Sequence, residues 1–389
     1  MTLKQIYRLY PKQIWTLTLI TFIFIARKTF FNVAREVGSY ATTVDSGTSL
    51  ALLGISMSMI VIIQNSSKIS RFSSKVFPFL AYYIFATLSF LWAGSAGTIL
   101  FKGIEVLCSF MIVCLTIYYI RSLKQALLYI VLLATASTAM DMMNKIIKYG
   151  FSYFHTNAYT MTSMIALLLL LSAVKHKIFS FKEMKYLIFY NAFMLVIGTS
   201  SASYISFVIG LVILMSSQYK RGMNICITLY FIYSYFQDFI FELLFPGRSM
   251  EKIENGSGRK AIWEAAFKLW DENPLIGNGL IVGERRIVEY IGLAVISAHN
   301  SFISVLVNTG IVGVVIFINF IFKWFLKVYR FQSTNRYAVI LLPAMVATIV
   351  NCNAFPAIGS DWNYVAPTVY ALIAFAFIIL RKYENNMGY

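Results

Sequence analysis

The chain has 389 residues, of which 59% are hydrophobic and only 13% are charged. Because about a quarter of the residues of a soluble domain are charged, a chain this apolar has more hydrophobic surface than one aqueous core encloses, and lipid is the expected solvent for much of it. A formal net charge of +17 is typical of nucleic-acid-binding proteins. Here the charge follows the pattern of membrane topology, so no nucleic-acid partner is expected.

Long apolar segments recur along the chain and predict an all-α integral membrane protein with about twelve transmembrane helices. The hydrocarbon core of a bilayer, about 30 Å thick, needs roughly 20 apolar residues in a helix. The first segment is interrupted by Arg27 and Lys28, and no small-residue cleavage site follows it, so an uncleaved helix is predicted in place of a secretory signal. The predicted spans are 13–34, 48–63, 76–93, 99–120, 124–141, 157–174, 184–199, 203–217, 223–241, 300–322, 337–352 and 363–380.

The basic residues indicate how these spans are oriented. With the N-terminus inside and the spans alternating, 20 of the 33 basic residues fall in the inner loops, but only Glu183 and Glu384 of the 16 acidic residues do so. Every inner loop is then basic, which is the positive-inside pattern of membrane proteins. Both termini are therefore expected in the cytoplasm.

The spans divide the chain into three parts. Residues 1–241 hold the first nine spans, residues 242–299 form one large extracytoplasmic loop, and residues 300–389 hold the last three spans and a short tail. A loop of this length is usually functional or disordered, and its apolar and aromatic residues argue against disorder. A transporter built from two related halves is expected to have corresponding loops of similar size, and this chain has no such symmetry.

The large loop has the pattern of short helices. Ser257 can cap a helix in which apolar residues recur at helical spacing, Asn273-Pro274 ends it, and Gly277-Asn278-Gly279 makes a turn. A second helix is expected from Glu284 toward Ile296. The first helix is predicted to lie in the lipid interface, with aromatic residues inward and cations toward water. The alternative is a strut that only packs the bundle.

The sequence contains no pattern for a metal or a cofactor. The four cysteines lie in or beside apolar spans without a CxxC pair, the three histidines are far apart, and there is no DxD or HExxH motif. Neither a metal site nor a cofactor is expected.

Four segments follow one another from the large loop into the next span. They are Gly258-Arg259-Lys260-Ala261-Ile262-Trp263, Asn273-Pro274-Leu275-Ile276-Gly277-Asn278-Gly279, Ala298-His299-Asn300-Ser301-Phe302 and Gly310-Ile311-Val312-Gly313. The series reads Arg, Trp, Pro-x-x-Gly-x-Gly, His-Asn and Gly-x-x-Gly. In this order and in a large outer loop, it resembles the O-antigen ligase and polymerase superfamily. A softer likeness lies at His155-Thr156-Asn157, which opens a span.

The resemblance implies a GT-C-type membrane fold and a metal-independent glycosyltransferase of the bacterial cytoplasmic (inner) membrane. Such enzymes take a glycan from undecaprenyl pyrophosphate and transfer it to a hydroxyl at the outer face. A polymerase of O-antigen, capsule or exopolysaccharide transfers it to another lipid-linked repeat unit, whereas a ligase transfers it to lipid A core or to a protein. The expected partners are the lipid-linked donor and acceptor, membrane lipid and, in such pathways, a chain-length regulator and a flippase. Outside this family, a lipid-linked oligosaccharide flippase is the alternative.

Two residues of the series are expected to carry the chemistry. The leaving group is a lipid diphosphate, which departs as an anion, and Arg259 near a helix N-terminus can bind its phosphates. The acceptor hydroxyl must lose a proton, which His299 at the mouth of a span can accept near neutral pH. Alternatively, Arg259 reaches lipid headgroups and His299 is a helix cap. Trp263, Asn300 and Asn157 are further candidates for substrate binding.

One position departs from the family pattern. Where the family often has Thr-x-Ser-Arg, this chain reads Thr199-Ser200-Ser201-Ala202, so one expected phosphate-binding arginine is absent. Arg27, Arg35 and Arg248 are candidates to replace it, together with Lys28. If the first span ends at Ala26, Arg27 and Lys28 are instead ordinary boundary charges.

Other charges near the predicted spans also raise functional questions. Glu36 and Asp45 in the first outer loop are alternative bases, because other GT-C enzymes place an acid there. Lys102, Glu105 and Asp141 lie within or beside spans, where charge is costly, and are expected to form internal pairs between helices.

Overall fold

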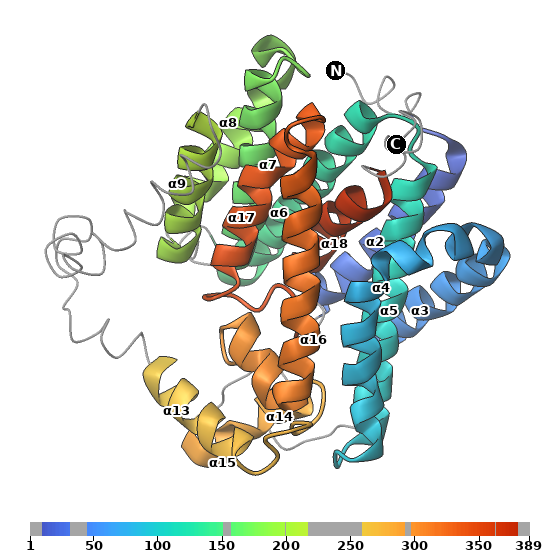
Figure 1. Cartoon of the computed structure of the whole chain (residues 1–389), viewed down its shortest axis with the longest axis vertical. Helices are drawn as coiled ribbons and strands as arrows, with labels where there is room; N and C mark the ends of the chain where they lie inside the picture. The colour runs from blue at the N-terminus through green and yellow to red at the C-terminus, as the bar shows by residue number, and fades with distance from the viewer. Residues whose placement is uncertain are drawn as a thin grey trace, which may run out of the picture.

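Helix is the only regular secondary structure in the part of the chain that the structure describes. The computed structural model describes residues 10–31, 45–150, 157–198, 200–216, 259–291, 297–361 and 363–379. Within these ranges there is no strand, so the predicted all-α class is confirmed. Figure 1 shows the longer helices side by side, with the short helices of the large loop gathered at one end.

Eleven of the predicted spans coincide with a helix, and the span predicted at 223–241 lies outside the described residues. The helices are α2 (Lys12–Phe30), α3 (Ser46–Gln64), α4 (Ser66–Leu88), α5 (Ala96–Tyr119), α6 (Leu123–Tyr149), α7 (Asn157–Lys175), α8 (Phe181–Ile197), α9 (Ser201–Met215), α16 (Ser301–Phe331), α17 (Arg336–Asn351) and α18 (Ala366–Ala374). Two short segments extend them, η1 (Ser89–Leu91) after α4 and η4 (Phe375–Ile379) after α18.

Two of these helices extend into segments that the sequence predicts as loops. α4 begins at Ser66, so Lys68, Arg71 and Lys75 lie on a helix and not in a loop. α16 continues to Phe331, past the predicted end at residue 322. Lys and Arg are good helix formers, and their long side chains carry the charge to water. Charges at the membrane boundary therefore do not end a helix, and the predicted boundaries are wrong at these two places.

Six helices of the described part are long and apolar enough to cross a membrane. They are Ser46–Gln64, Ser66–Leu91, Ala96–Tyr119, Leu123–Tyr149, Ala158–Lys175 and Ser301–Phe331, while α9, α17 and α18 are apolar but shorter. Large apolar side chains remain exposed on α3, α8 and α16, among them Ile63, Phe193 and Phe322. Such exposure is expected where lipid is the solvent. The chain is a multi-pass membrane protein, and the number of twelve spans stays a prediction.

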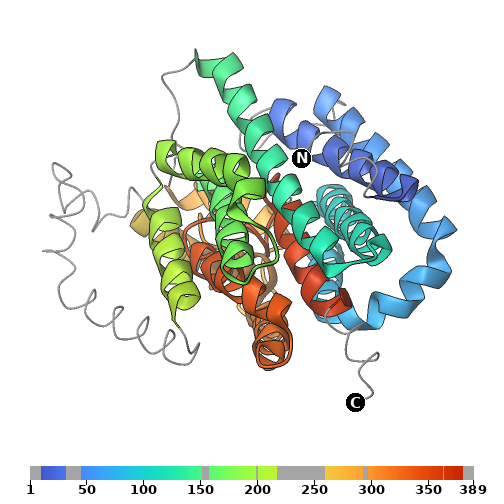
Figure 2. The same cartoon turned by 90° about the horizontal axis from the view of Figure 1, so that it is seen from above.

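α7 and α18 lie inside the bundle. α7 contacts α6, α8, α9 and α17, and α18 contacts α5, α6 and α17. Seen from above, α18 lies between the α2–α5 helices and the α6–α9 helices (Figure 2). Every residue from Ala366 to Ile378 is buried. The α17–α18 loop (residues 352–365) is therefore held where the two groups of helices meet.

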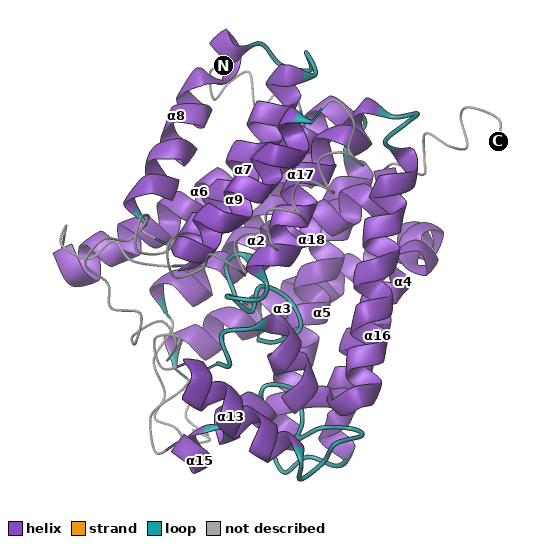
Figure 3. Cartoon of the chain, turned by 60° about the vertical axis from the view of Figure 1, so that its left-hand side comes forward, coloured by secondary structure: helices purple, strands orange, loops and turns teal. Residues whose placement is uncertain are grey.

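The described residues of the large loop form three short helices, α13 (Arg259–Trp270), α14 (Val282–Arg286) and α15 (Val288–Ile291). The first was predicted. The second predicted helix is divided into α14 and α15, and its end at residues 292–296 lies outside the described residues. All three helices lie at the end of the molecule where α16 begins (Figure 3), and α13 and α14 pack against α16.

One face of α13 packs against protein. A small apolar cluster joins α13 to α16, to the segment before α16 and to the residue between α14 and α15; its members are Ala265, Ala266, Leu269, Ile287, Ala298 and Val307. This contact is the one expected of a strut. Phe267 on another face is exposed and is able to meet lipid, so the position of α13 in the lipid interface stays a prediction.

α16 is broken at Gly310, and the Pro-x-x-Gly-x-Gly segment fills the break. Gly310 has φ 62° and ψ −167°, outside the helical region. The backbone groups released there would be left without partners, which is costly in a buried position. Residues 274–279 supply the partners: Asn278 N and Gly279 N donate to Val307 O and Asn308 O, both at 2.9 Å, and Ile311 N and Val312 N donate to Pro274 O and Leu275 O at 2.9 and 3.1 Å.

The glycines of the two motifs are required by this docking. Gly277 (φ 71°) and Gly310 (φ 62°) both adopt left-handed backbone conformations. A Cβ on Gly277 would lie 2.4 Å from Thr309 N, and one on Gly310 would lie 2.4 Å from Leu275 O. Both clashes are with backbone, which cannot turn away. The order Pro-x-x-Gly-x-Gly then Gly-x-x-Gly thus describes one interlocked backbone contact.

We expect Gly310→Ala to destabilise the protein by about 1–3 kcal/mol or more, because it adds left-handed strain to a backbone clash. The midpoint of thermal unfolding in detergent should fall. Gly97→Ala is the matched control, since a Cβ there meets nothing within 4 Å and alanine favours a helix. An unchanged midpoint for Gly310→Ala would contradict the interlocked contact.

Candidate active site

A strained turn carries His299 into α16. His299 has φ 52°, a left-handed conformation that is uncommon outside glycine. Its backbone N donates to Ser297 Oγ at 3.0 Å, and the indole Nε1 of Trp263 donates to Ala298 O at 3.0 Å. Strain of this kind persists only where neighbouring contacts hold it, and such residues cluster at active sites.

Asn300, the next residue, caps α16. Its Oδ1 accepts from Phe302 N at 2.8 Å and from Ile303 N at 3.2 Å. The following residue is tied to the α17–α18 loop, since Ser301 N donates to Cys352 O at 2.8 Å. The helix cap is therefore Asn300, and the alternative in which His299 is the cap is wrong. A role for Asn300 in binding substrate stays a prediction.

The imidazole of His299 is available for chemistry. It is partly buried and has no hydrogen-bond partner among the described residues. Burial lowers the pKa of His299, and the nearby guanidinium of Arg259 lowers it further. The neutral imidazole, which can accept a proton, is therefore favoured at neutral pH.

Arg259, the first residue of α13, is the cation that lies near His299. Its Nη2 donates to Ala354 O of the α17–α18 loop at 3.3 Å. In the described part of the chain no carboxylate pairs with it. Burial lowers the pKa of Arg259, although a guanidinium stays protonated in proteins. A cation with one neutral contact is suited to an anionic ligand.

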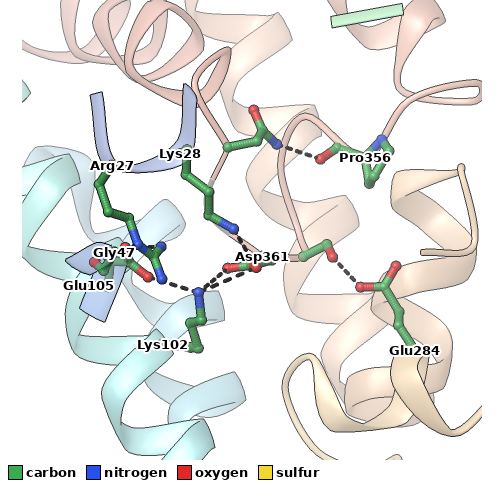
Figure 4. Close-up of polar contacts among 10 residues, drawn as sticks. Arg27, Lys28, Gly47, Lys102, Glu105, Glu284, Pro356 and Asp361 are labelled. Atoms are coloured by element: carbon green, nitrogen blue, oxygen red, sulfur yellow. Dashed lines mark hydrogen bonds and ion pairs between the residues drawn. The ribbon is translucent and has the colours of Figure 1, made fainter. Parts of the chain in front are cut away.

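Glu284 of α14 is a buried carboxylate that connects three segments. It accepts from the hydroxyls of Ser304 and Ser360, from Ala298 N at 3.3 Å and from Asn308 Nδ2 at 3.4 Å. Burial raises the pKa of Glu284, and these donors partly offset that rise. The carboxylate thereby joins α14 to α16 and to the turn of His299. Figure 4 shows its contact with the α17–α18 loop.

A second group of charges lies on the other side of the α17–α18 loop. Arg27 Nη1 contacts Glu105 at 2.5 Å and Lys28 Nζ contacts Asp361 at 2.7 Å. Lys102 Nζ lies between the two carboxylates, 3.1 Å from Glu105 and 3.2 Å from Asp361 (Figure 4). We call these five residues the α2–α5 charge cluster. The helix α2 does not end at Ala26, so Arg27 and Lys28 are not simple boundary charges.

The consecutive residues Ser360 and Asp361 join the hydrogen-bond network of Glu284 to the α2–α5 charge cluster. Ser360 contacts Glu284, and Asp361 contacts the lysines of the cluster. Gly359 ties the loop to α4, since its N donates to the Tyr83 hydroxyl at 2.8 Å and its O accepts from the Tyr82 hydroxyl at 2.6 Å. Burial alone would raise the pKa of Asp361, but Lys102, Lys28 and Arg27 hold it well below its usual range.

The segment without the family arginine carries small polar side chains. Ser200 caps α9, with its hydroxyl accepting from Ser203 N at 3.4 Å. Ser203 Oγ donates to Thr160 Oγ1 at 3.0 Å and accepts from Asn351 Nδ2 at 3.2 Å. No cation of the described residues takes part in these bonds, so any replacement for the missing arginine comes from elsewhere.

Several predicted site residues cannot be placed. Arg35, Arg248 and Glu36 lie outside the described residues. Asn157 is the first residue of α7, and its side chain is not described. Asp45, the other alternative base, caps α3 by accepting from Thr48 N at 2.6 Å.

The predicted pairing between helices is confirmed for Glu105, which meets Arg27 of α2, whereas Asp141 pairs within its own helix. Lys102 and Glu105 pair within α5 and also reach Asp361 and Arg27. Asp141 pairs with Lys145 at 2.9 Å and accepts from the Tyr364 hydroxyl at 2.6 Å. The described residues contain no group of three His, Cys, Asp or Glu side chains that could hold a metal ion.

Sequence reasoning missed Glu284, Ser360 and Asp361 as parts of the site. Glu284 was expected only as the start of a helix. Lys28 and Asp361 are 333 residues apart in the sequence, and no motif connects them. The only signal was the polar stretch Gly359-Ser360-Asp361 between two apolar spans.

Comparison with known families supports the motif series. Residues 186–318 match the family model described as O-Antigen ligase. The match includes most of α8, all of α9 and α13, the turn of His299 and the break in α16. It confirms the resemblance to the O-antigen ligase and polymerase superfamily. No curated protein matches the sequence.

We expect Glu284→Gln to loosen the turn of His299. The amide keeps the size of the carboxylate but loses its charge and one acceptor, which costs about 1–3 kcal/mol at a buried hydrogen-bonded group. Amide hydrogen exchange over residues 297–304 should accelerate roughly five- to a hundred-fold. Glu289→Gln is the control, because Glu289 is half exposed and pairs only with Arg286 among the described residues. Unchanged exchange in Glu284→Gln would rule out this role.

Proposed function

We propose that this multi-pass membrane protein, in which residues 186–318 match the O-antigen ligase family, is a polysaccharide polymerase. It would transfer a glycan from an undecaprenyl-pyrophosphate-linked donor to the end of another lipid-linked repeat unit, at the outer face of the bacterial cytoplasmic membrane. The observation that supports this most is the proximity of Arg259 and His299. Among the described residues, Arg259 has no carboxylate partner and the imidazole of His299 has no hydrogen-bond partner.

The two residues suit the two halves of the transfer. The bond between the anomeric carbon of the donor sugar and the diphosphate oxygen breaks, and the diphosphate leaves as an anion. Arg259 would bind it through charge-assisted hydrogen bonds. The acceptor hydroxyl oxygen bonds to the anomeric carbon, and its proton passes to His299. No metal is required, because the leaving group already departs with its charge.

The lowered pKa of His299 has a direct consequence for pH dependence. A base must be unprotonated, and burial beside Arg259 favours the neutral form. Transfer would therefore persist through neutral pH and decline only as the pH falls through the lowered pKa of His299.

Trp263 would bind the sugar. Its indole Nε1 is occupied by Ala298 O, so the face of the indole ring is the part that could stack on sugar.

Twelve spans, a GT-C-type fold and cytoplasmic termini belong to this proposal. With alternating spans, the end of α2, the start of α5, the start of α16 and the α17–α18 loop all fall on the outer side. The contacts Lys28–Asp361 and Glu284–Ser360 join these same elements. That agreement supports the orientation inferred from the basic inner loops.

The ligase is the alternative within the family. It would use the same donor and the same residues and differ only in its acceptor, lipid A core or protein. A flippase is less well supported, because the long loop with α13, α14 and α15 has no counterpart elsewhere in the described helices.

We expect Arg259→Ala to lower polymer synthesis about ten- to a hundred-fold, with Lys restoring only part of it. His299→Ala should lose roughly 10²–10⁴-fold, with single repeat units accumulating on their lipid carrier. Glycolipids extracted from cells and separated by chain length provide the measurement. Lys260→Ala and His176→Ala are the matched controls.

Three outcomes separate the alternatives. Loss of the ladder with single units still delivered to the final acceptor supports a polymerase. Full-length polymer that stays on its lipid carrier indicates a ligase. A normal ladder in His299→Ala would remove His299 as the base and leave Glu36 or Asp45, or no base at all.

We also expect residue 260 to face outward and residue 182 to face the cytoplasm. Both side chains are exposed, so a cysteine at either position should react once a reagent reaches it. In a cysteine-free background, an impermeant maleimide should label intact cells at position 260 and not at 182. The reverse pattern would overturn the orientation.

A further inference from the structure

We propose that the α2–α5 charge cluster binds the diphosphate of the second lipid-linked substrate, the acceptor, through Lys28 and Lys102. This inference rests on the proposed polymerase function and goes beyond it by assigning the acceptor a phosphate site separate from Arg259. The ligand chemistry is a polyprenyl diphosphate at the membrane surface.

The cluster carries one more positive than negative charge. Arg27, Lys28 and Lys102 face only Glu105 and Asp361, so the five side chains sum to a charge of +1. The three cations are 11%, 12% and 7% exposed, and Glu105 is fully buried. An unmatched charge in such a place is costly unless a counter-ion joins it. The imbalance therefore points to an anionic ligand.

The cluster is most exposed at Asp361. The side chain of Asp361 is 27% exposed, more than any other in the cluster. Arg27 is occupied by Glu105 and by Gly47 O at 3.3 Å, whereas Lys28 and Lys102 both point to Asp361 (Figure 4). A phosphate that enters beside Asp361 would meet these two ammonium groups. Lysine binds phosphate as a point charge on a flexible stem.

Two separate cation sites therefore border the α17–α18 loop. Arg259 contacts it at Ala354, and Lys28 and Lys102 contact it at Asp361. Ser360 and Glu284 link the second site to the turn of His299. A single diphosphate would need one such site, and a polymerase holds two lipid-linked substrates at once.

The donor diphosphate and the acceptor diphosphate need different groups around them. The donor loses its diphosphate, so its site needs a cation that stabilises the leaving group beside the base. The acceptor keeps its diphosphate, and no bond to that group is made or broken. Its site needs charge alone, and the described cluster contains cations and carboxylates but no histidine.

The test varies the charge of the cluster in steps. Lys28→Gln makes it neutral, Asp361→Asn raises it to +2, and Lys28→Arg leaves it at +1. The purified protein is placed in nanodiscs of neutral phosphatidylcholine, and binding of polyprenyl diphosphate is followed by native mass spectrometry. Polyprenol without phosphate is the control ligand. Lys145→Gln is the control variant, because Lys145 is 13% exposed and paired with Asp141 outside the cluster.

We expect two equivalents of polyprenyl diphosphate for the unchanged protein. Lys28→Gln should lower the affinity for one of these two ligands about ten- to a hundred-fold, and Asp361→Asn should raise the affinity for the same ligand. Lys28→Arg and Lys145→Gln should leave both affinities unchanged. Arg259→Ala should weaken the other equivalent. If the ion pairs were purely structural, removing the anion Asp361 would disturb the site as much as removing the cation Lys28, and both variants would bind the ligand less tightly. Tighter binding by Asp361→Asn is therefore expected only if the cluster binds an anion.

Three results would overturn the assignment. They are a single equivalent in the unchanged protein, two undiminished equivalents in Lys28→Gln, or weaker binding in Asp361→Asn. Nanodiscs with phosphatidylglycerol form a further arm: equal competition by this lipid at the cluster would make it a headgroup site. The binding readout requires no transfer. A normal ladder in His299→Ala would remove His299 as the base, and full-length polymer that stays on its lipid carrier would indicate a ligase; neither result changes the count of bound diphosphates.

Discussion

The carboxylate of Glu284 is the contact on which the arrangement of the site depends. It receives hydrogen bonds from α16, from the turn before α16 and from the α17–α18 loop. The α17–α18 loop is far from the other two segments in the sequence, and the carboxylate adds a buried contact to the bond from Ser301 N to Cys352 O. A buried carboxylate is costly by itself, but it becomes a strong organising group when donors surround it. Its position next to both His299 and Ser360 relates the proposed base to the charge cluster.

The surrounding fold explains why such a contact can persist. α18 is buried along its length and sits between two groups of helices, so the loop that precedes it has fixed ends. Tyr82 and Tyr83 hold Gly359 from the side of α4. The charges of α2 and α5 then meet a loop that is already in place. Charge, hydroxyl and aromatic contacts converge on one short segment, because that segment lies where the two halves of the bundle meet.

Much of the fold was predictable because the relevant signals are local. Hydropathy located eleven helices. The order of Arg259, Trp263, Pro274 and His299 predicted the resemblance that the family model over residues 186–318 supports, and Arg259 lies near His299 in the structure. Helix boundaries failed at Lys68 and beyond residue 322, since lysine and arginine continue a helix as readily as they end a span. The charge cluster could not be predicted, because Arg27 has its partner 78 residues away and Lys28 has its partner 333 residues away. Pairing at that distance leaves no periodicity in the sequence.

The break in α16 also determines which part of this chain can be exchanged as a unit. The segment 274–279 is joined to α16 by backbone hydrogen bonds on both sides of Gly310, and α13 is joined to the same helix by the cluster around Leu269. Transplanting the loop alone into a related scaffold would leave its backbone groups without acceptors and leave the host helix with an unfilled gap. The stretch from Arg259 through Gly313 keeps both of these contacts together, while Ser89, Trp92, Cys352 and Ser360 bond to it from outside. Recombination among related membrane proteins would therefore keep these contacts most readily when its crossover points fall outside that stretch.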